Sequence, residues 1–311
     1  MNFTTRNEIG ARFKLIARKK DGSIARETDW FLNKVLASGL AQMSVGTWIN
    51  RCCVGSGNST PTSSQTSLDT LVASTTSFLT DVGVSHTTSP IYFGARRTWR
   101  FGEGVAAGNI SEVGMGWSDA AMWNRALIRD ILGNPTTITV LSDEFLDVVA
   151  EIRVYPPEIQ SGSFNVTDKS GAVLEAHSYE CIPLIPSPGT FSAQKITAES
   201  LSNGAVATLH SSGIQTITTG PSQPSHGVQA PQTTQNNPTP NSLGLTFSLR
   251  LSDAVMSIKS IRVGFSLLSS AYSAGGAIGY QLEISPPFNK TNLMTVNIKL
   301  NLTWSEYTGG L

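Results

Sequence analysis

The stretch MTVNIKLNLTW at residues 294–304 alternates strictly between apolar and polar side chains. If it forms a strand, one face carries the apolar residues Val296, Ile298, Leu300, Leu302 and Trp304. Similar alternation returns in FLDVVAEIRVY, LGLTFSLRLS and IKSIRVGFSLL, with turns and almost no helical pattern between the segments. Such spacing is typical of antiparallel sandwiches rather than parallel α/β sheets. The sequence therefore predicts a mainly β protein, an antiparallel β-sandwich with one short helix and long polar loops.

Two local patterns refine this expectation near the start of the chain. The dipeptide Asp21-Gly22 stands between alternating segments and predicts a β-hairpin. Asp29 can cap a helix over TDWFLNKVLASGLAQM, which Gly39 weakens towards its end. This segment is the best candidate for the short helix.

Changes in residue composition along the 311 residues suggest that the chain has three parts. Residues 1–155 are expected to form a β-rich domain with the short helix, and Pro156-Pro157 ends its last strand by removing two donors. Residues 156–244 are expected to be an irregular insertion rich in Pro, Gln, Asn and Ser, in which residues 203–243 form a long loop or an arm ordered by a partner. Residues 245–311 supply strands that complete the same sandwich or a second one.

Charge and hydropathy exclude several classes of partner. Charged residues make up 14 % of the chain, against about 25 % in an ordinary soluble domain. Lys plus Arg and Asp plus Glu number 22 each, so bulk charge attracts neither nucleic acid nor an anionic membrane. No apolar segment is long enough to span a bilayer, and the opening MNFTTRNEIGARFKLIARKK lacks a secretory apolar region. We expect a soluble protein made in a cytoplasm.

The reactive residue types do not form a recognisable catalytic or metal-binding set. Cys52, Cys53 and Cys181 show no CxxC spacing, and neighbours on a strand point to opposite faces, so we expect buried, reduced thiols. The four histidines are scattered, with no HExxH or GxSxG motif. Neither a metal nor a cofactor is predicted, and the chain is not expected to be an enzyme.

One catalytic alternative remains open. Asp143, Glu144 and Asp147 could supply a pair of carboxylates for glycan hydrolysis if their separation suits that reaction. The first two are better explained as residues of a turn between strands.

Aromatic and arginine side chains provide the candidate binding residues. Trp99 stands between Arg97 and Arg100, and such groups are frequent in interface hot spots and can stack on a sugar. Tyr272 and the loop around His226 are further candidates. The alternative for the tryptophans is a place in the sandwich core or in a subunit contact.

Five segments occur in an order that resembles the tail-fibre and tail-tip structural proteins of tailed bacteriophages. They are DGSIARETDWFLNKVLASGLAQM, CVGSGNSTPTSSQTSLDT, WNRALIRD, ITVLSDEFLDVVAEIRVYPP and GYQLEISPPFNKTNLMTVNIKLNLTWSE. The resemblance covers most of residues 10–155 and 276–306. It implies a virion component that is made in the host cytoplasm and repeated symmetrically around the tail.

The expected partners follow from that resemblance. They are further copies of the chain, with a trimer as the expected number, other phage tail proteins, and a glycan or protein receptor on the host cell. The alternatives are a carbohydrate-binding module and a virion-associated polysaccharide depolymerase.

Overall fold

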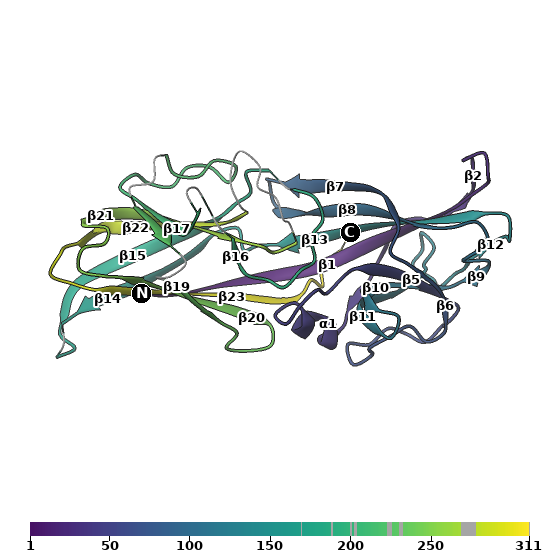
Figure 1. Cartoon of the computed structure of the whole chain (residues 1–311), viewed down its shortest axis with the longest axis horizontal. Helices are drawn as coiled ribbons and strands as arrows, with labels where there is room; N and C mark the ends of the chain where they lie inside the picture. Colours follow the sequence, from purple (N-terminus) through teal and green to yellow (C-terminus); the bar gives the residue numbers. More distant parts are fainter. Residues whose placement is uncertain are drawn as a thin grey trace.

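The computed structural model of the chain describes residues 1–168, 170–187, 189–199, 201, 204–222, 226–229, 233–268 and 278–310. It confirms a mainly β protein with antiparallel sheets and a short helix. Figure 1 shows an elongated molecule with layers of strands at both ends.

Three large sheets and one two-stranded sheet build the molecule over these residues. The first, which we call the shared sheet, has the order β19-β20-β23-β1-β13-β8-β7, and β2 and β3 also pair with β1. Its strands are β1 (Asn2–Arg18), β2 (Ile24–Glu27), β3 (Phe31–Leu32), β7 (Phe78–His86), β8 (Tyr92–Phe101), β13 (Phe145–Tyr155), β19 (Thr233–Asn236), β20 (Ser242–Leu249) and β23 (Val296–Glu306).

The other sheets are smaller. The second sheet has the order β4-β11-β10-β5-β6, with β4 (Lys34–Val35), β5 (Arg51–Gly55), β6 (Leu71–Thr75), β10 (Glu112–Ser118) and β11 (Ala121–Leu127). The third sheet has the order β14-β15-β22-β21-β17-β18, and β16 pairs with β21. Its strands are β14 (Gln160–Thr167), β15 (Val173–Leu184), β16 (Ala198–Glu199), β17 (Ala205–His210), β18 (His226–Gln229), β21 (Met256–Phe265) and β22 (Gly279–Lys290). Apart from these, β9 (Gly108–Ile110) pairs with β12 (Ile138–Val140).

Strand β1 runs through both halves of the molecule (Figure 1). Its residues Glu8–Arg18 pair antiparallel with β13, and Asn2–Ile9 pair with β23. The second sheet covers the β13 half of the shared sheet, and the third sheet covers the β23 half. The β1–β23 pair is parallel, whereas the other strand pairs of the described residues are antiparallel.

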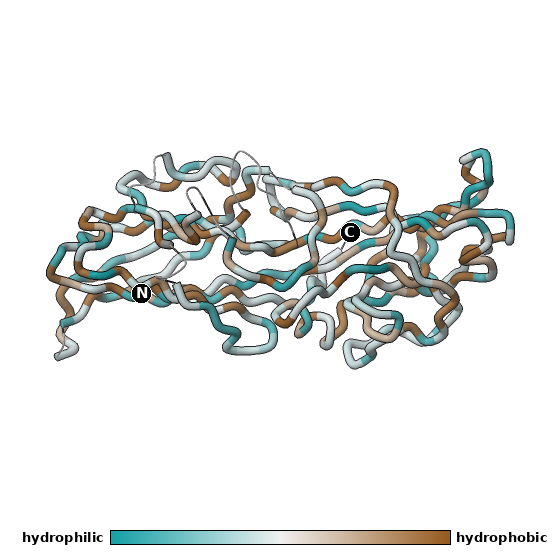
Figure 2. The backbone as a smooth tube through the Cα atoms, viewed as in Figure 1, coloured by the Kyte–Doolittle hydropathy of each residue, from teal (hydrophilic) through white to brown (hydrophobic). Residues whose placement is uncertain are grey.

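The alternation in the last strand is confirmed. Ile298, Leu300, Leu302 and Trp304 are buried, whereas the polar residues between them are exposed or half-buried. Trp304 Nε1 donates to the carbonyl oxygen of Leu40 at 2.8 Å. Figure 2 shows hydrophobic and hydrophilic positions alternating along many strands. The alternation of apolar and polar residues along the strand therefore places the apolar side chains in the core between the sheets.

Aromatic contacts join the layers in each half. Phe3 on β1 packs edge-on against Tyr179 on β15, with ring centroids 5.3 Å apart. Tyr280 Oη on β22 donates to Asn7 Oδ1 on β1. Both contacts connect the shared sheet to the third sheet, so β1 forms part of the core of that half.

Helix α1 (Ala37–Gln42) is shorter than the sequence predicts. Leu36 is its N-cap, and the predicted start at Asp29 is wrong because β3 pairs with β1 and β4 pairs with β11 just before the helix. Tertiary pairing thus overrides the local helical pattern. The helix lies close to β11, where a Cβ on Gly39 would meet the Trp123 carbonyl oxygen at 2.4 Å.

Residues 156–244 contain more regular structure than expected. Strands β14 to β19 and the start of β20 lie in this segment, so the prediction of an irregular insertion is wrong for them. Every residue of β17 is buried, because β17 pairs with β21 in the third sheet. The apolar run AVA of β17 is short, and it acquires its core through a strand far away in the sequence.

The cysteines behave as the sequence predicts. Cys52, Cys53 and Cys181 are buried and form no disulfide. Cys52 belongs to the main core, whereas Cys53 packs with Leu36, Leu68 and Met122 on the other side of β5. Burial raises the pKa of the Cys53 thiol to about 12. Within the described residues, no helix has the length and apolarity that crossing a bilayer requires.

Candidate functional site

Three of the residues that the sequence proposes for binding lie on β8 of the shared sheet, where Arg97 and Trp99 point to one face and Arg100 points to the other. Trp99 has an exposed fraction of 0 % and packs edge-on against Phe191, with centroids 6.3 Å apart. Arg97 points the same way, with its guanidinium 4.1 Å from the ring centroid of Phe78 and its Nη2 2.6 Å from Asp81 Oδ2. Trp99 therefore belongs to the core, the alternative left open above, and cannot stack on a ligand in this structure.

The other proposed residues are dispersed. Arg100 points to the opposite, outer face of the shared sheet, where it contacts Asp147. His226 lies on β18 of the third sheet, and within the described residues its buried Nε2 has no hydrogen-bond partner. Tyr272 lies outside the described residues. The structure does not bring His226 together with the arginines, which belong to a different sheet.

The outer face of the shared sheet carries a cluster that the sequence did not reveal. We call it the arginine–aromatic face. It consists of Arg12, Arg18, Trp30, Tyr92, Arg96, Arg100, Arg153, Tyr155 and Tyr307 around the carboxylates Asp147 and Glu151.

Strand register creates this cluster. Arg12 on β1 lies opposite Glu151 on β13, which lies opposite Arg96 on β8. Four residues back along β13, Asp147 lies opposite Arg100. Since successive side chains alternate between faces, charges spaced by an even number of residues share the outer face. Cross-strand pairing then gathers opposite charges into rows.

Three guanidinium groups converge on Glu151, whose side chain is 1 % exposed. Arg12 Nη2 lies 3.0 Å from Oε1, Arg153 Nε donates to Oε1 at 2.7 Å, and Arg96 Nε donates to Oε2 at 2.6 Å. Burial raises the pKa of Glu151, but hydrogen bonds from Arg96 and Arg153 and the charges of Arg12 and Arg153 outweigh burial and lower it below its ordinary value. Glu151 therefore holds the three arginines in place as a carboxylate.

A second, similar group forms around Asp147. Arg18 Nε donates to Oδ2 at 2.7 Å, while Arg100 donates to both carboxylate oxygens, each at 2.7 Å. The hydrogen bond to Asp147 raises the pKa of Arg100 above its ordinary value. Such two-point contacts fix both the position and the plane of a guanidinium group.

Aromatic rings continue the face beyond the charges. His86, Tyr92, Tyr155 and Tyr307 form a row with successive centroid distances of 5.5, 5.6 and 3.8 Å. The Arg153 guanidinium lies 4.3 Å from the Tyr92 ring centroid. Apart from exposed His86, these rings are half-buried, so each presents part of its surface to solvent.

The ring of Trp30 lies next to two arginines of the arginine–aromatic face. The guanidinium carbons of Arg12 and Arg96 lie 4.5 and 5.9 Å from its ring centroid. Both distances fall within the range of cation–π attraction.

The arginine–aromatic face has a local excess of positive charge on a neutral chain. Five arginines surround two carboxylates, which leaves a surplus of three. Counting Glu8, which pairs in register with Tyr155, reduces the surplus to two. Nearby Lys14 is neutralised by Glu27 at 2.9 Å. Guanidinium groups bind carboxylates and other oxyanions through paired N–H donors, so this surface is suited to an anionic ligand.

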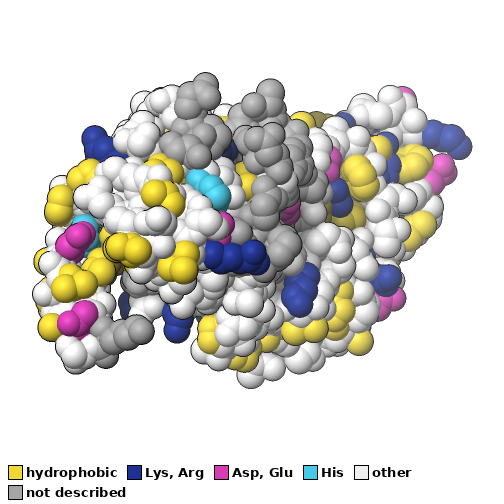
Figure 3. Space-filling view, turned by 60° about the vertical axis from the view of Figure 1, so that its left-hand side comes forward, with side chains coloured by type: hydrophobic (Ala, Val, Ile, Leu, Met, Phe, Trp, Pro, Cys, Tyr) yellow, Lys and Arg dark blue, Asp and Glu magenta, His cyan; other side chains and the backbone are white. Residues whose placement is uncertain are grey.

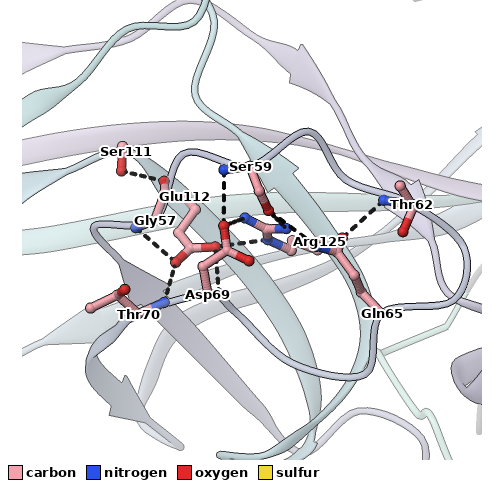
Figure 4. Close-up of polar contacts among 9 residues, drawn as sticks. All are labelled: Gly57, Ser59, Thr62, Gln65, Asp69, Thr70, Ser111, Glu112 and Arg125. Atoms are coloured by element: carbon pink, nitrogen blue, oxygen red, sulfur yellow. Dashed lines mark hydrogen bonds and ion pairs between the residues drawn. The ribbon is translucent and has the colours of Figure 1, made fainter.

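A separate buried network fixes the polar loop between β5 and β6 (Figure 4). The fully buried carboxylate of Glu112 accepts backbone N–H groups from Gly57 and Thr70, each at 2.9 Å. Arg125, also fully buried, donates from Nε to Glu112 at 2.7 Å and from Nη2 to Asp69 at 2.6 Å. The loop that carries the exposed Ser and Thr residues is therefore tied to the second sheet at both ends.

The candidate carboxylates for glycan hydrolysis have structural contacts. Glu144 accepts the backbone N–H of Leu141 at 2.9 Å and pairs with Arg26. Asp147 is held by two arginines, as described above. Asp143 and Glu144 lie in the turn between β12 and β13, in agreement with the turn explanation.

A groove opens between the sheets at the end of the molecule that carries the third sheet. Its volume is about 800 Å³, and its lining includes Phe164, Ile258, Phe288, Val296 and Ile298. Leu293 at its margin is 87 % exposed. Figure 3 shows hydrophobic side chains gathered on this end of the molecule. The groove offers apolar surface, and its lining also includes Asp168 and the N-terminal residue Met1.

Searches for other chemistry and for similar proteins give no assignment. Among the described residues, no group of three or more His, Cys, Asp or Glu side chains is placed to hold a metal ion. Comparison with protein-family models, curated proteins and solved structures finds no match to this chain.

Proposed function

We propose that the chain is a structural protein of a bacteriophage tail, in the fibre, the tip or the baseplate region, that contributes to host attachment. The order of the five sequence segments described above supports this proposal. In this function the protein is located in the virion after assembly in the host cytoplasm, and its partners are other tail proteins and a host receptor.

The observation that carries the proposal is the shared strand β1. It pairs over Glu8–Arg18 with β13 and over Asn2–Ile9 with β23, so the cores of both halves rest on one continuous strand. A hinge between the halves would have to break this pairing. An elongated, stiff body of this kind suits a part that holds a receptor-binding surface at a fixed position.

Recognition would then belong to the solvent-facing features on the scaffold. The arginine–aromatic face and the anchored loop between β5 and β6 are each held by a buried carboxylate, Glu151 in the first case and Glu112 in the second. Pre-ordered groups lose less conformational entropy when a ligand binds. Repetition of the chain, with a trimer as the proposed number, would multiply weak single contacts into firm adhesion.

A carbohydrate-binding module is the second candidate. The row of half-buried tyrosines beside arginines on a sheet face favours it. The two candidates differ in location, since a module acting alone has no reason to be part of a phage particle.

Mass spectrometry of purified particles tests the proposal, together with immunogold labelling that locates the chain on the tail. We expect the chain in the particles at a copy number that matches a tail symmetry. Its absence from intact infectious particles would contradict the tail assignment and leave the carbohydrate-binding module. Light scattering after size exclusion tests the trimer, and a monomer at high concentration would count against it.

A further inference from the structure

We propose that the arginine–aromatic face binds a carbohydrate polymer that carries carboxylate groups on its sugar rings. This inference rests on the proposed role in host attachment and adds the chemical class of the ligand. It depends on the charge of the face, on the free donors and spacing of its guanidinium groups, and on its aromatic rings.

The arginine–aromatic face carries more cationic than anionic groups. Glu151 and Asp147 are almost fully buried, with side-chain exposures of 1 % and 2 %, whereas Arg96 and Arg100 are 43 % and 31 % exposed. The carboxylates are thus shielded from solvent, whereas these two arginines are partly exposed to it. Each of the two acids contacts more than one arginine. The additional guanidinium groups present positive charge to solvent.

The guanidinium groups of Arg96 and Arg100 retain N–H donors that their carboxylate partners do not use. Each guanidinium group has five N–H donors. The bonds of Arg96 and Arg100 to their carboxylates use Nε and Nη2. Within the described residues, neither Nη1 group has a hydrogen-bond partner. These donors are held in a fixed plane by the buried acids, so an incoming carboxylate meets them already oriented.

The spacing of the arginine groups along the strands favours a polymeric ligand. Arg96 and Arg100 are four residues apart on β8, and Glu151 and Asp147 are four residues apart on β13. At about 3.4 Å per residue, the two arginine groups are separated by roughly 13 to 14 Å along the strands. A single carboxylate cannot contact both groups, whereas a chain with repeated carboxylates can.

An aromatic surface lies next to the charged groups. The half-buried rings of Tyr92, Tyr155 and Tyr307 extend the face past Arg153. Such rings offer an apolar surface to the C–H faces of sugars and a polar hydroxyl at their edge. Charge and rings lie on the same sheet face, so one extended ligand can use both.

Single-stranded nucleic acid is also anionic and also stacks on aromatic rings. Its binding relies on a broad positive field and on the neutralisation of many phosphates. Here the surplus is two or three charges on a chain with 22 basic and 22 acidic residues. Tyr155 and Tyr307 stack on each other at 3.8 Å, so a ligand of either kind meets only the outward surfaces of the row and cannot insert between these two rings. The observations therefore favour an acidic glycan.

The test uses the full chain with oligomers of polygalacturonic acid and of hyaluronan, and with the same oligomers after reduction of their carboxyl groups to alcohols. Isothermal titration calorimetry at low and high salt measures binding. We expect at least one acidic oligomer to bind, the reduced forms to bind at least about tenfold more weakly, and added salt to weaken the acidic complex. Failure of both acidic oligomers to bind, or equal binding of the reduced forms, overturns the proposal.

Variants locate the binding on this face. The double variant Arg96→Gln/Arg100→Gln should lower affinity for the acidic oligomer by about tenfold or more. Arg51→Gln, which removes an arginine paired with Asp119 on the second sheet, is the matched control and should bind as the wild type does. Circular dichroism and urea midpoints verify that each variant is folded. An unchanged affinity in the folded double variant overturns the proposal.

Three further outcomes distinguish the ligand assignment from the tail assignment. Binding of single-stranded DNA as tight as that of the acidic oligomer, and lost in the same double variant, would replace the glycan by nucleic acid. If the chain is found in virions but binds neither acidic oligomer, the ligand assignment fails while the tail assignment stands. If it binds the acidic oligomer but is missing from virions, the tail assignment fails instead.

Discussion

The substitution Glu151→Gln removes the charge around which the arginine–aromatic face is ordered. The glutamate carboxylate is 1 % exposed and contacts Arg12, Arg96 and Arg153. Glutamine keeps the size of the side chain. It replaces one acceptor oxygen by an amino group that points its own donors at guanidinium donors. Three cations then remain close together without the anion between them.

The expected loss in the free energy of unfolding depends on how far each arginine side chain can turn towards water. Removal of one partner from a fully buried ion pair costs about 3–5 kcal/mol. Arg96 is 43 % exposed and Arg12 is 21 % exposed, so both can turn towards water, whereas Arg153 at 13 % is confined. Partial escape reduces the cost, and we expect the free energy of unfolding to fall by about 2–4 kcal/mol.

Urea denaturation monitored by circular dichroism measures this loss as a shift of the midpoint at an unchanged slope. The control is Glu103→Gln, because Glu103 pairs with Lys20 at 3.6 Å and both side chains are well exposed. An exposed pair contributes about 0–1 kcal/mol, so the control midpoint should barely move. Equal midpoints for the wild type and Glu151→Gln would refute the argument that Glu151 organises the face.

Four other outcomes follow from the structure. The pKa of folded Glu151 lies below its ordinary value because the arginine contacts outweigh burial, so its stabilising effect is present above the ordinary pKa and is lost as pH falls through the folded pKa. Between about pH 7 and pH 3 the urea midpoint should therefore fall further for the wild type than for Glu151→Gln. Glu112→Gln should expose the loop between β5 and β6 to limited proteolysis, whereas Asp119→Asn, which alters an exposed pair, should leave it protected. Trp304→Ala should lower the free energy of unfolding by about 3–5 kcal/mol in urea melts, since the buried ring also donates to Leu40. Burial raises the pKa of the Cys52 thiol well above its ordinary value, so a thiol reagent should react with it only after unfolding, as followed by absorbance.

Local patterns in the sequence predicted the class of fold. The apolar residues of β23 are buried as alternation requires, and Asp21-Gly22 lies at the turn between β1 and β2. Pro156 follows the last residue of β13, as expected from its missing donor. These features depend on a few adjacent residues, which the sequence displays directly.

Pairing between distant segments could not be predicted in the same way. The helix expected from Asp29 is cut short because residues before it pair with β1 and β11. Strand β17 is buried by β21, and its sequence neighbours are polar. In both cases a long-range contact decides the local structure.

The candidate site illustrates the same limit. Arg97 and Trp99 attracted attention as neighbours of Arg100, yet odd positions on β8 face the core and even positions face solvent. Spacings such as Arg96 to Arg100 and Glu151 to Arg153 do place charges on one face of their own strands. The sequence does not show that Arg12 lies across from Glu151, 139 residues away.

The parallel pair of β1 and β23 has a consequence for the order of events during synthesis. Asn2 lies opposite Lys299, so the first half of β1 leaves the ribosome long before its neighbour exists. Its second half can already pair with β13, while the first half keeps unpaired backbone groups and the apolar side chain of Phe3 exposed in the meantime. Closure of the sheet then awaits the last strand, and a nascent chain stalled before β23 should be prone to association with others through this open edge.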